Sequence, residues 1–396
     1  MLAACAAPAA SDDVTRPGET PAPQPTETPT EKPTPTPVTI VGATQDGVAV
    51  VQRGPDLVAI DLATKNETIL AKTKARVTVA DDAVAFIADG KLAIYRKTQG
   101  VVATNIAATS GDKDCTLDVA TAGKRTFVSS CAPGATSPAL RTIDSVAKIV
   151  TLREDVKRPW AVADDGASAF VIAKDGQAAV HTVPANAVTP IDSNVTWGRF
   201  GRRGTDVLYR TTASDLRRAA TVAPVRPVTL IEEGVAAVDA LSPDLQWMLA
   251  STTPPENGRH DLRLTPVPPG MPFIPTPTVP VDLVLTPTGL SLGFTGDGEY
   301  AAYLADLTLH IRTASDKDGK DVVVAKDVVS ARVIAGSSDV IFATGTKDTV
   351  DISVVDATSG KVSVLATGVS PSYATAAGTL VFTKRGAAAI ETKSVR

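Results

Sequence analysis

A short polar turn recurs along this chain at intervals of about 40 residues. Most copies lie between two apolar runs rich in β-branched residues, which favour strands. Successive turns are separated by 36, 41, 42, 39, 40, 53, 41 and 40 residues. This spacing indicates that one small all-β unit is repeated. One residue from each turn marks its position: Asp46, Asp82, Gly123, Asp165, Gly204, Asp244, Asp297, Ser338 and Gly378.

Each unit is predicted to contain four strands. The first unit shows apolar runs at 38–41, 48–51, 57–62 and 68–70. A late unit shows them at 331–334, 340–343, 352–356 and 362–365. Four-stranded antiparallel meanders repeated at this period are the blades of a β-propeller. We therefore predict an all-β propeller over residues 38–396, with eight blades favoured and seven to nine left open.

The last predicted unit has only three apolar runs, at 373–375, 380–383 and 389–391. Propellers often close by combining strands from both ends of the chain in one blade. We therefore expect the strand at 38–41 to be the fourth strand of that last unit.

The N-terminus resembles the end of a bacterial lipoprotein signal. Residues 2–5 (LAAC) resemble a lipobox, which implies that Cys5 is lipidated and that residues 1–5 are the end of the signal. Residues 6–37 contain nine prolines and predict a disordered tether. Only Met1 precedes the lipobox, whereas a signal has basic and apolar regions there. Either the true start lies upstream, or the match is accidental and the chain begins with a disordered cytosolic segment.

The remaining cysteines predict an oxidising compartment. Cys115 and Cys131 lie eight residues on either side of Gly123. A hairpin with its turn at Gly123 places them face to face, within the range of a disulfide. Disulfides persist outside the reducing cytosol. The alternative is a pair of buried free thiols in a cytosolic core. With the lipobox, the pair predicts a lipid-anchored protein of the bacterial envelope, on the periplasmic or the cell-surface side.

Composition argues against several partners. The formal net charge is −4 and no Lys/Arg block occurs, so we do not expect nucleic-acid binding. No run of 18 apolar residues is present, so we expect no membrane-spanning helix. Aromatic residues make up only 4%, too few for the stacked platforms of carbohydrate sites or for a Trp-lined quinone site. We expect no cofactor.

Catalytic and metal-binding patterns are weak. The three histidines, His181, His260 and His310, fall in different units, and no Gly-x-Ser-x-Gly motif occurs. A short acidic loop has oxygen ligands at alternating positions but lacks the distal Glu of a calcium loop. A solvated hairpin turn is the favoured interpretation, so we predict no metal site. The weak metal candidates in that loop are Asp316, Asp318 and Asp321.

Two segments are candidate binding sites. Arg199, Arg202 and Arg203 form the densest positive charge and match a phosphate or carboxylate; the alternative is a solvated hairpin. Residues 254–287 contain ten prolines and predict mostly loop. Three apolar residues within that loop predict a surface that docks a partner, unless they fold back over a blade. They are Met271, Phe273 and Ile274.

The repeat resembles TolB-like and WD-like propellers. Residues 241–250 (LSPDLQWMLA) and 294–303 (FTGDGEYAAY) resemble the Ser-Pro-Asp-Gly turn and the strand after it. Residues 354–361 (VVDATSGK) resemble the end of the third strand and its turn. The units depart from the pattern at Arg203, Leu245 and Ser338. The resemblance implies the propeller fold and a binding role in the cell envelope, and it supplies no catalytic residue.

These observations favour a tethered, non-enzymatic propeller, expected as a monomer, that binds a protein or an envelope polymer. Two alternatives remain open. One is a propeller enzyme, a lyase or hydrolase, with residues such as Asp164, Asp165, Arg202 and Arg203 at the mouth of the channel. The other is a ligand sensor that signals to a membrane protein.

Overall fold

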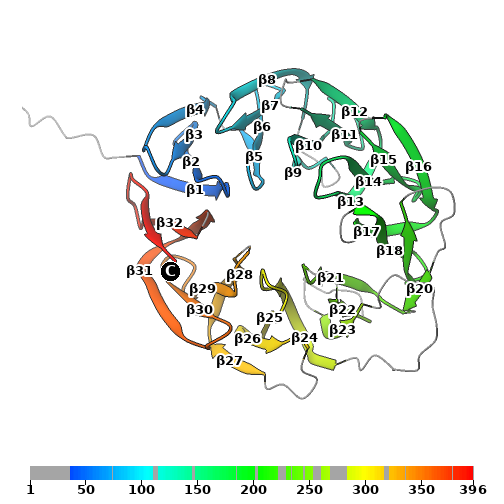
Figure 1. Cartoon of the computed structure of the whole chain (residues 1–396). Helices are drawn as coiled ribbons and strands as arrows, with labels where there is room; N and C mark the ends of the chain where they lie inside the picture. The colour runs from blue at the N-terminus through cyan, green and yellow to red at the C-terminus, as the bar shows by residue number, and fades with distance from the viewer. Residues whose placement is uncertain are drawn as a thin grey trace, which may run out of the picture. The chain divides into compact units, whose positions relative to one another are not determined.

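The protein is described by a computed structural model. The described residues are 36–73, 75–109, 115–144, 148–183, 185–200, 204–221, 229–232, 234–243, 246–252, 260–267, 283–315, 321–334, 336–376 and 378–395. They form antiparallel sheets arranged as blades around a central axis (Figure 1). Among these residues, no helix has the length and apolarity needed to cross a membrane.

The first five blades are separate four-stranded sheets. Their strands pair in chain order, each with the next. Blade one is β1 (Val38–Ala43), β2 (Val48–Arg53), β3 (Asp56–Asp61) and β4 (Glu67–Ala71); blade two is β5 (Arg76–Val79), β6 (Val84–Ala88), β7 (Lys91–Arg96) and β8 (Gly100–Ala107); blade three is β9 (Asp118–Ala122), β10 (Arg125–Ser130), β11 (Ala139–Ile143) and β12 (Ile149–Arg153). Blade four is β13 (Val156–Val162), β14 (Ser168–Ala173), β15 (Ala178–Thr182) and β16 (Ala187–Asp192); blade five is β17 (Val195–Phe200), β18 (Asp206–Thr211), β19 (Leu216–Ala220) and β20 (Thr229–Glu232).

Two long strands each serve two blades. β24 (Leu283–Phe294) pairs through its first part with β23 and through its second part with β25. β31 (Val362–Ala376) joins β30 to β32 in the same way. The remaining strands are β21 (Ala237–Leu241), β22 (Trp247–Ser251), β23 (His260–Pro266), β25 (Tyr300–Ala305), β26 (Thr308–Thr313), β27 (Val322–Ala325), β28 (Val328–Val333), β29 (Asp339–Gly345), β30 (Val350–Asp356), β32 (Thr379–Lys384) and β33 (Glu391–Ser394).

The prediction of eight four-stranded blades is confirmed. Blade six is β21, β22, β23 and the first part of β24; blade seven is the second part of β24 with β25, β26 and β27. Blade eight is β28, β29, β30 and the first part of β31. Within the described residues, a ninth unit has three strands: the second part of β31, β32 and β33.

The expected role of the strand at 38–41 is wrong. β1 pairs with β2 and is the first strand of blade one, because the tight turn at 44–47 already gives it a neighbour. The ring closes instead by packing of side chains. Val38 and Ile40 of β1 share a buried cluster with Ala374 and Val381 of the ninth unit. The Ser372 hydroxyl also donates to the carbonyl of Ile40, at 2.5 Å.

Second strands form the core of the blades. Each packs between the sheets of two neighbours, so the strand is buried on both faces and its sequence is a continuous apolar run. Residues 48–51 of β2 are fully buried. The largest buried side chains lie on second strands of other blades: Phe86, Phe127, Phe170, Tyr209 and Tyr303.

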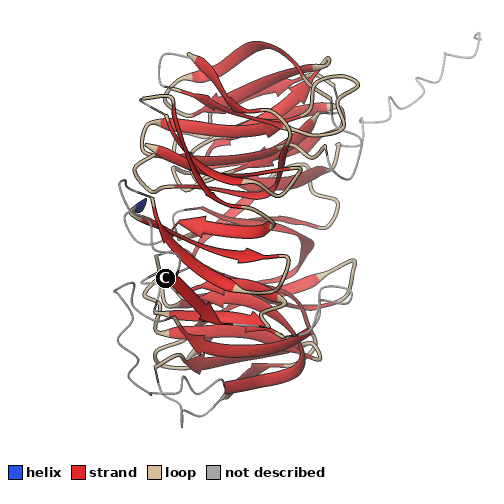
Figure 2. Ribbon diagram, turned by 90° about the vertical axis from the view of Figure 1, so that its right-hand side faces the viewer, coloured by secondary structure: helices blue, strands red, loops and turns tan. Residues whose placement is uncertain are grey.

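The direction of the strands divides the ring into two faces. First strands such as β5, β9 and β13 lie nearest the axis and fourth strands such as β8 and β16 lie at the rim (Figure 1). First strands all run in the same direction, so the turns that follow them gather on one face, which we call the turn face. Figure 2 shows the ring from its side.

The proline-rich segment 254–287 contains more strand than the sequence predicts. Its residues 260–266 form β23, and β24 begins at Leu283. β23 is possible because its single proline, Pro266, is its last residue, where it interrupts the ladder least. The predicted docking residues Met271, Phe273 and Ile274 lie outside the described residues.

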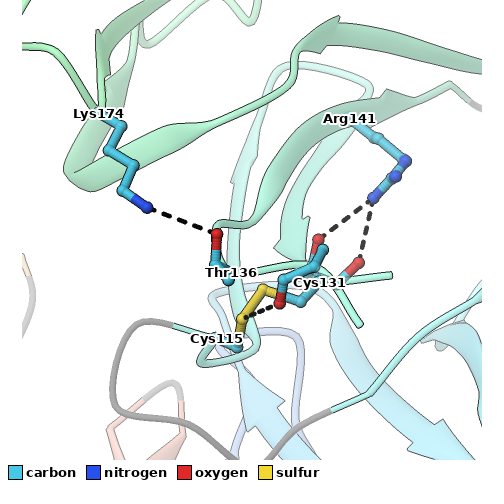
Figure 3. The surroundings of a disulfide bond; sticks show 7 residues. Cys115, Cys131, Thr136, Arg141 and Lys174 are labelled. Carbon is cyan, nitrogen blue, oxygen red and sulfur yellow. Dashed lines mark hydrogen bonds between the residues drawn. A yellow bond between two sulfur atoms is a disulfide. The ribbon is translucent and has the colours of Figure 1, made fainter. Parts of the chain in front are cut away.

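Cys115 and Cys131 form a disulfide, as predicted (Figure 3). Their Cα atoms are 5.4 Å apart and both residues are buried. The predicted register is off by one residue. Arg125 pairs with Ala122, so the turn is centred between Gly123 and Lys124, and Cys131 is not directly opposite Cys115. Cys115 instead precedes β9, in irregular chain that brings its Sγ toward Cys131.

We predict that loss of this disulfide destabilises the propeller. A cross-link that closes a loop of about 15 residues restricts the unfolded chain and contributes about 3 kcal/mol. The variant with both cysteines replaced by serine should lose about that much free energy of unfolding in urea titrations. The wild-type protein under reducing conditions should match the variant. Equal stability of the oxidised and reduced wild type would contradict the prediction.

Candidate functional site

The same hydrogen-bond pattern holds the turn between the first and second strands in blades one and seven. In blade one, the Thr44 hydroxyl accepts from the amide of Val48 at 3.1 Å and donates to the Asp46 carboxylate. In blade seven, Thr295 accepts from Tyr300 at 3.2 Å and donates to Asp297. The hydroxyl thus links a backbone amide at the end of the turn to the carboxylate within it, which stabilises the turn. Asp46 and Asp297 are therefore held in place on the turn face.

Neighbouring turns contact one another. The amide of Gln45 donates to the carbonyl of Asp81, which joins blades one and two. Gly123 and Gly166 join blades three and four, both with positive φ, at 57° and 68°. A Cβ atom on Gly123 would lie 2.5 Å from the Asp165 carbonyl oxygen. Glycine is therefore required at this contact, because only glycine combines that φ with so close an approach.

These four turns surround a hollow of about 570 Å³ on the turn face. We call it the acidic hollow, because four carboxylates line it. Its other lining residues are small or polar and come from the same turns or the strand ends beside them. The lining residues are Gln45, Asp46, Asp81, Asp82, Thr121, Ala122, Gly123, Val162 and Asp164.

Among the described residues, the carboxylates of the hollow have no cationic side chain within ion-pair distance. Within the described part of the chain, no ion pair involves Asp46, Asp81, Asp82 or Asp164. Lys97 comes close, but its ammonium donates to the backbone carbonyl of Asp46 at 3.1 Å. Four negative charges therefore remain available in the hollow.

Lys97 makes its ion pair with Asp61, at 3.1 Å. The backbone amide of Thr64 and then this ammonium hold the pKa of the Asp61 carboxyl below its usual range. The charge of Lys97 is thus shared with a carboxylate outside the hollow. This leaves the acidic character of the hollow largely intact.

The predicted anion site is only partly described. Arg199 is exposed on β17, and Arg202 and Arg203 lie outside the described residues. Two arginines near this segment in sequence are already neutralised. Arg217 pairs with Asp192 and Asp215, and Arg218 pairs with Asp206. The positive charge of this blade is therefore smaller than its sequence suggests.

The weak metal candidates are also only partly described. Asp316 and Asp318 lie outside the described residues. Asp321 accepts a hydrogen bond from the Tyr303 hydroxyl at 2.7 Å and lies 2.7 Å from Nδ1 of His310. Burial, followed by the bond to Asp321, raises the pKa of Tyr303. Asp321 thus contacts two side chains of its own blade, Tyr303 and His310. Among the described residues, no group of three side chains that could hold a metal ion is found.

His181 is buried in β15 of blade four. Burial, and secondarily the charge of Arg153, lowers the pKa of its imidazole, which keeps it neutral. His310 stacks on Tyr303 with ring centroids 5.0 Å apart. Both side chains pack within their blades. The side chain of His260 lies outside the described set. Cys5 is not among the described residues either.

The acidic hollow was only partly visible in the sequence. Asp46 and Asp82 mark turns of the repeat, and Asp164 was proposed for an enzymatic mouth, but they were not joined into one site. The signal was present: several units place an acidic residue at the same position of the repeat. First strands that run in one direction bring these residues to one face.

The chain forms an all-β propeller of four-stranded antiparallel blades. No protein-family model matches it, and no curated protein matches it. Solved structures resemble it in fold. The β-propeller domain of Cps50 (Swd1) from Myceliophteria thermophila is 11% identical, with 70% of this chain and 98% of that chain covered and a TM-score of 0.41.

A prolyl endopeptidase structure is 14% identical, with 74% of this chain and 49% of that chain covered and a TM-score of 0.48. A chain of the mitotic checkpoint complex is 10% identical, with 72% and 95% covered and a TM-score of 0.45. These likenesses concern the fold alone, so the function is argued from the site.

We predict that the contact at Gly123 is required for stability. In Gly123→Ala the new Cβ meets the carbonyl of Asp165, and alanine at this positive φ is strained. Together these effects should cost about 2–3 kcal/mol of unfolding free energy. Gly90→Ala is the matched control, because Gly90 has a φ of 72° and open space around its Cβ position. It should lose only about 1 kcal/mol. Equal losses in urea titrations would contradict the close contact of the turns.

Proposed function

We propose that the protein is a non-enzymatic binding scaffold of the bacterial cell envelope, which takes a basic segment of a partner protein into the acidic hollow. The observation that carries the proposal is the set of four carboxylates on the turns of blades one, two and four, for which no ion pair is found among the described residues. Carboxylates at a surface hollow attract cationic side chains and guide them to one place. A basic segment would neutralise charges for which the described residues supply no ion pair.

The rigidity of the turns supports binding. The Thr44 hydroxyl holds the turn that carries Asp46, and a backbone hydrogen bond from Gln45 to Asp81 joins that turn to the next one. A preorganised surface loses little conformational entropy when it binds, so more of the interaction energy appears as affinity. Propellers present such turns on a ring, a geometry suited to a binding face.

The geometry gives less support to the enzymatic alternative. Asp164 and Asp165 lie on the turn face, and Asp165 accepts from the amide of Ala167 at 2.8 Å, a turn-stabilising role. The largest pKa displacements occur at Tyr209 and Tyr303, inside blades five and seven, where burial raises both. A catalytic mouth would combine perturbed groups with a nucleophile or a base at hydrogen-bond distance. We therefore propose binding rather than catalysis.

The envelope location rests on the sequence and on the disulfide. The Leu2–Cys5 segment resembles a lipobox, and a proline-rich segment follows it. The disulfide is the type of cross-link that persists outside the cytosol. We propose that a lipid on Cys5 anchors the protein and that residues 6–37 hold the propeller away from the membrane, as a monomer.

We predict that the acidic hollow binds a lysine-rich decapeptide. Calorimetric titration at low salt should give saturable binding to the wild type. In the triple variant Asp46→Asn, Asp82→Asn and Asp164→Asn the dissociation constant should rise at least tenfold, because three attractive charges are lost. Binding to the wild type should weaken as salt is added.

The matched control removes three charges from the opposite face. Asp89, Asp327 and Asp348 are exposed in connections on that face, so the triple Asp→Asn variant has the same net charge as the hollow variant. Its affinity for the peptide should stay within twofold of the wild type. Equal weakening in both variants would show a net-charge effect and would contradict a site in the hollow.

We predict that Cys5 is lipidated when the gene is expressed at its own chromosomal locus. Cells grown with a clickable palmitate analogue should give labelled wild-type protein in the membrane fraction. Cys5→Ser should be unlabelled, because serine cannot form the thioether that carries the lipid. Unlabelled wild-type protein would contradict the proposed anchor and leave the binding proposal to be judged on its own test.

A further inference from the structure

The inner side of the ring carries a second hollow, with a volume of about 430 Å³. Its lining residues come from β1, β5, β28 and the second part of β31. These are the first strands of four consecutive units around the ring, and first strands lie nearest the axis (Figure 1). We therefore call it the axial hollow. It shares no lining residue with the acidic hollow.

Arg332 of β28 is the only charged residue among the described residues that line the axial hollow. It is exposed, and within the described part of the chain it makes no ion pair. The other lining residues are valine, alanine, glycine, threonine and tyrosine. An arginine side chain is always charged in a protein. The lining of the axial hollow is therefore positive, whereas that of the acidic hollow is negative.

Tyr373 of β31 holds the guanidinium of Arg332 in place. The Cζ atom of Arg332 lies 4.5 Å from the centroid of the tyrosine ring, which makes a cation–π contact. Nη2 of Arg332 also donates to the backbone carbonyl of Tyr373 at 3.1 Å. Tyr373 is itself buried, and its hydroxyl lies 2.9 Å from that of Ser330. This anchoring reduces the conformational entropy that Arg332 loses when it binds a ligand.

The guanidinium keeps donors for a ligand. An arginine has five N–H donors in one plane, and the structure shows one hydrogen bond from this group, to the Tyr373 carbonyl. The tyrosine ring covers a face of that plane, so it does not block the donors at the edge. Two donors at the edge match two oxygens of a carboxylate or a phosphate. Arg332 is thus positioned to bind an oxyanion.

The hollow also offers apolar surface beside this charge. The pairing of β1 with β2 shifts between Ile40 and Gly42, so Val41 forms a bulge without a partner in the register. Bulges often occur next to binding sites, where they redirect a strand. Val41 is 39% exposed and lines the hollow together with Val77 and Val79 of β5. These valines can contact the carbon body of a ligand.

We propose that the axial hollow binds a small organic anion, whose carboxylate or phosphate group accepts hydrogen bonds from Arg332 and whose carbon body contacts the valines of β1 and β5. The volume of the hollow lies in the range of about 300–1,000 Å³ that is typical of small-molecule sites. An inorganic ion would fill only a small part of it. This inference goes beyond the proposed scaffold function, because it concerns a small ligand and a different set of residues.

Two acidic residues of the acidic hollow follow the strands that line the axial hollow. Asp46 lies in the turn after β1 and Asp81 in the turn after β5, and neither lines the axial hollow. Their charges oppose the binding of an anion. Salt screens exposed charges over about 8 Å, whereas the guanidinium contacts the ligand directly. Removal of acidic charges from the turns should therefore leave anion binding intact or strengthen it.

The test titrates butyrate, butyl phosphate, inorganic phosphate and butyramide into the full-length protein by calorimetry. Butyrate or butyl phosphate should bind saturably at millimolar concentration, and the stronger of the two identifies the preferred head group. Butyramide has the size of butyrate without its charge and should bind at least tenfold more weakly. Inorganic phosphate has no carbon body, so it should bind more weakly than butyl phosphate.

Variants assign the binding to Arg332. Arg332→Gln should weaken it at least tenfold, because the charge and the paired donors are lost. Arg332→Lys keeps the charge without the planar group, so its affinity should lie between those of the wild type and Arg332→Gln. Arg385→Gln is the matched control, since Arg385 is exposed after β32 and does not line the hollow. It should bind within twofold of the wild type, and circular dichroism melts should show all the proteins folded.

Three results would overturn the proposal. The first is that neither organic anion binds the wild type, and the second is that Arg332→Gln binds no more weakly than Arg385→Gln. The third is that inorganic phosphate binds as tightly as butyl phosphate, which would show that Arg332 holds a simple ion only. The lysine-rich peptide is titrated into the same proteins and should bind Arg332→Gln as it binds the wild type. Failure at the axial hollow is therefore distinguishable from failure of the scaffold function.

Discussion

The structure depends on sheet-to-sheet packing that must continue around the whole ring. Each blade buries both faces of its second strand against two neighbours, so no blade completes its core alone. The ring therefore needs a closing contact between its first and last units. Val38 and Ile40 of β1 provide it by packing on Ala374 and Val381, residues more than 330 positions away in the chain. Packing of side chains thus closes the ring, in place of a sheet formed by strands from both ends of the chain.

The same packing produces the acidic hollow. Blades stacked side by side bring the turns after their first strands into contact, as at Gln45 with Asp81 and at Gly123 with Gly166. Acidic residues of these turns, of which Asp46 accepts a hydrogen bond from Thr44 in its own turn, then lie together on one face. Four of them remain without an ion pair among the described residues. The stacking of the turns between first and second strands thus produces a negatively charged surface.

Closure without strand exchange also explains why the ninth unit has three strands among the described residues. If β1 had joined the last unit, that unit would have four strands and blade one would have three. Instead β1 is retained by β2 through the turn at 44–47, and the three-stranded unit lies at β33. The sequence patterns alone were unable to decide between these arrangements, because both use the same apolar run at 38–41. The two arrangements differ only in the strand with which residues 38–41 pair, which is a tertiary contact.

Much of the fold was predictable from the sequence, because the period of the turns and the apolar runs carry the repeat. The disulfide was predictable from the symmetry of its cysteines, although a two-residue turn shifted the register by one position. The site was less predictable. Asp46 and Asp164 are 118 residues apart, and only the curvature of the ring brings their blades to one hollow. Ion pairs such as those of Arg217 and Arg218 also depend on contacts that the sequence does not reveal.

The most direct test of the scaffold function is site-specific photocrosslinking in living cells. A photoreactive residue replaces Gln45, which lines the acidic hollow, and in a second strain it replaces Asp348, which is exposed on the opposite face. The scaffold account predicts a discrete protein adduct from position 45 that is absent from position 348. An adduct common to both positions, or no protein adduct from position 45, would contradict it.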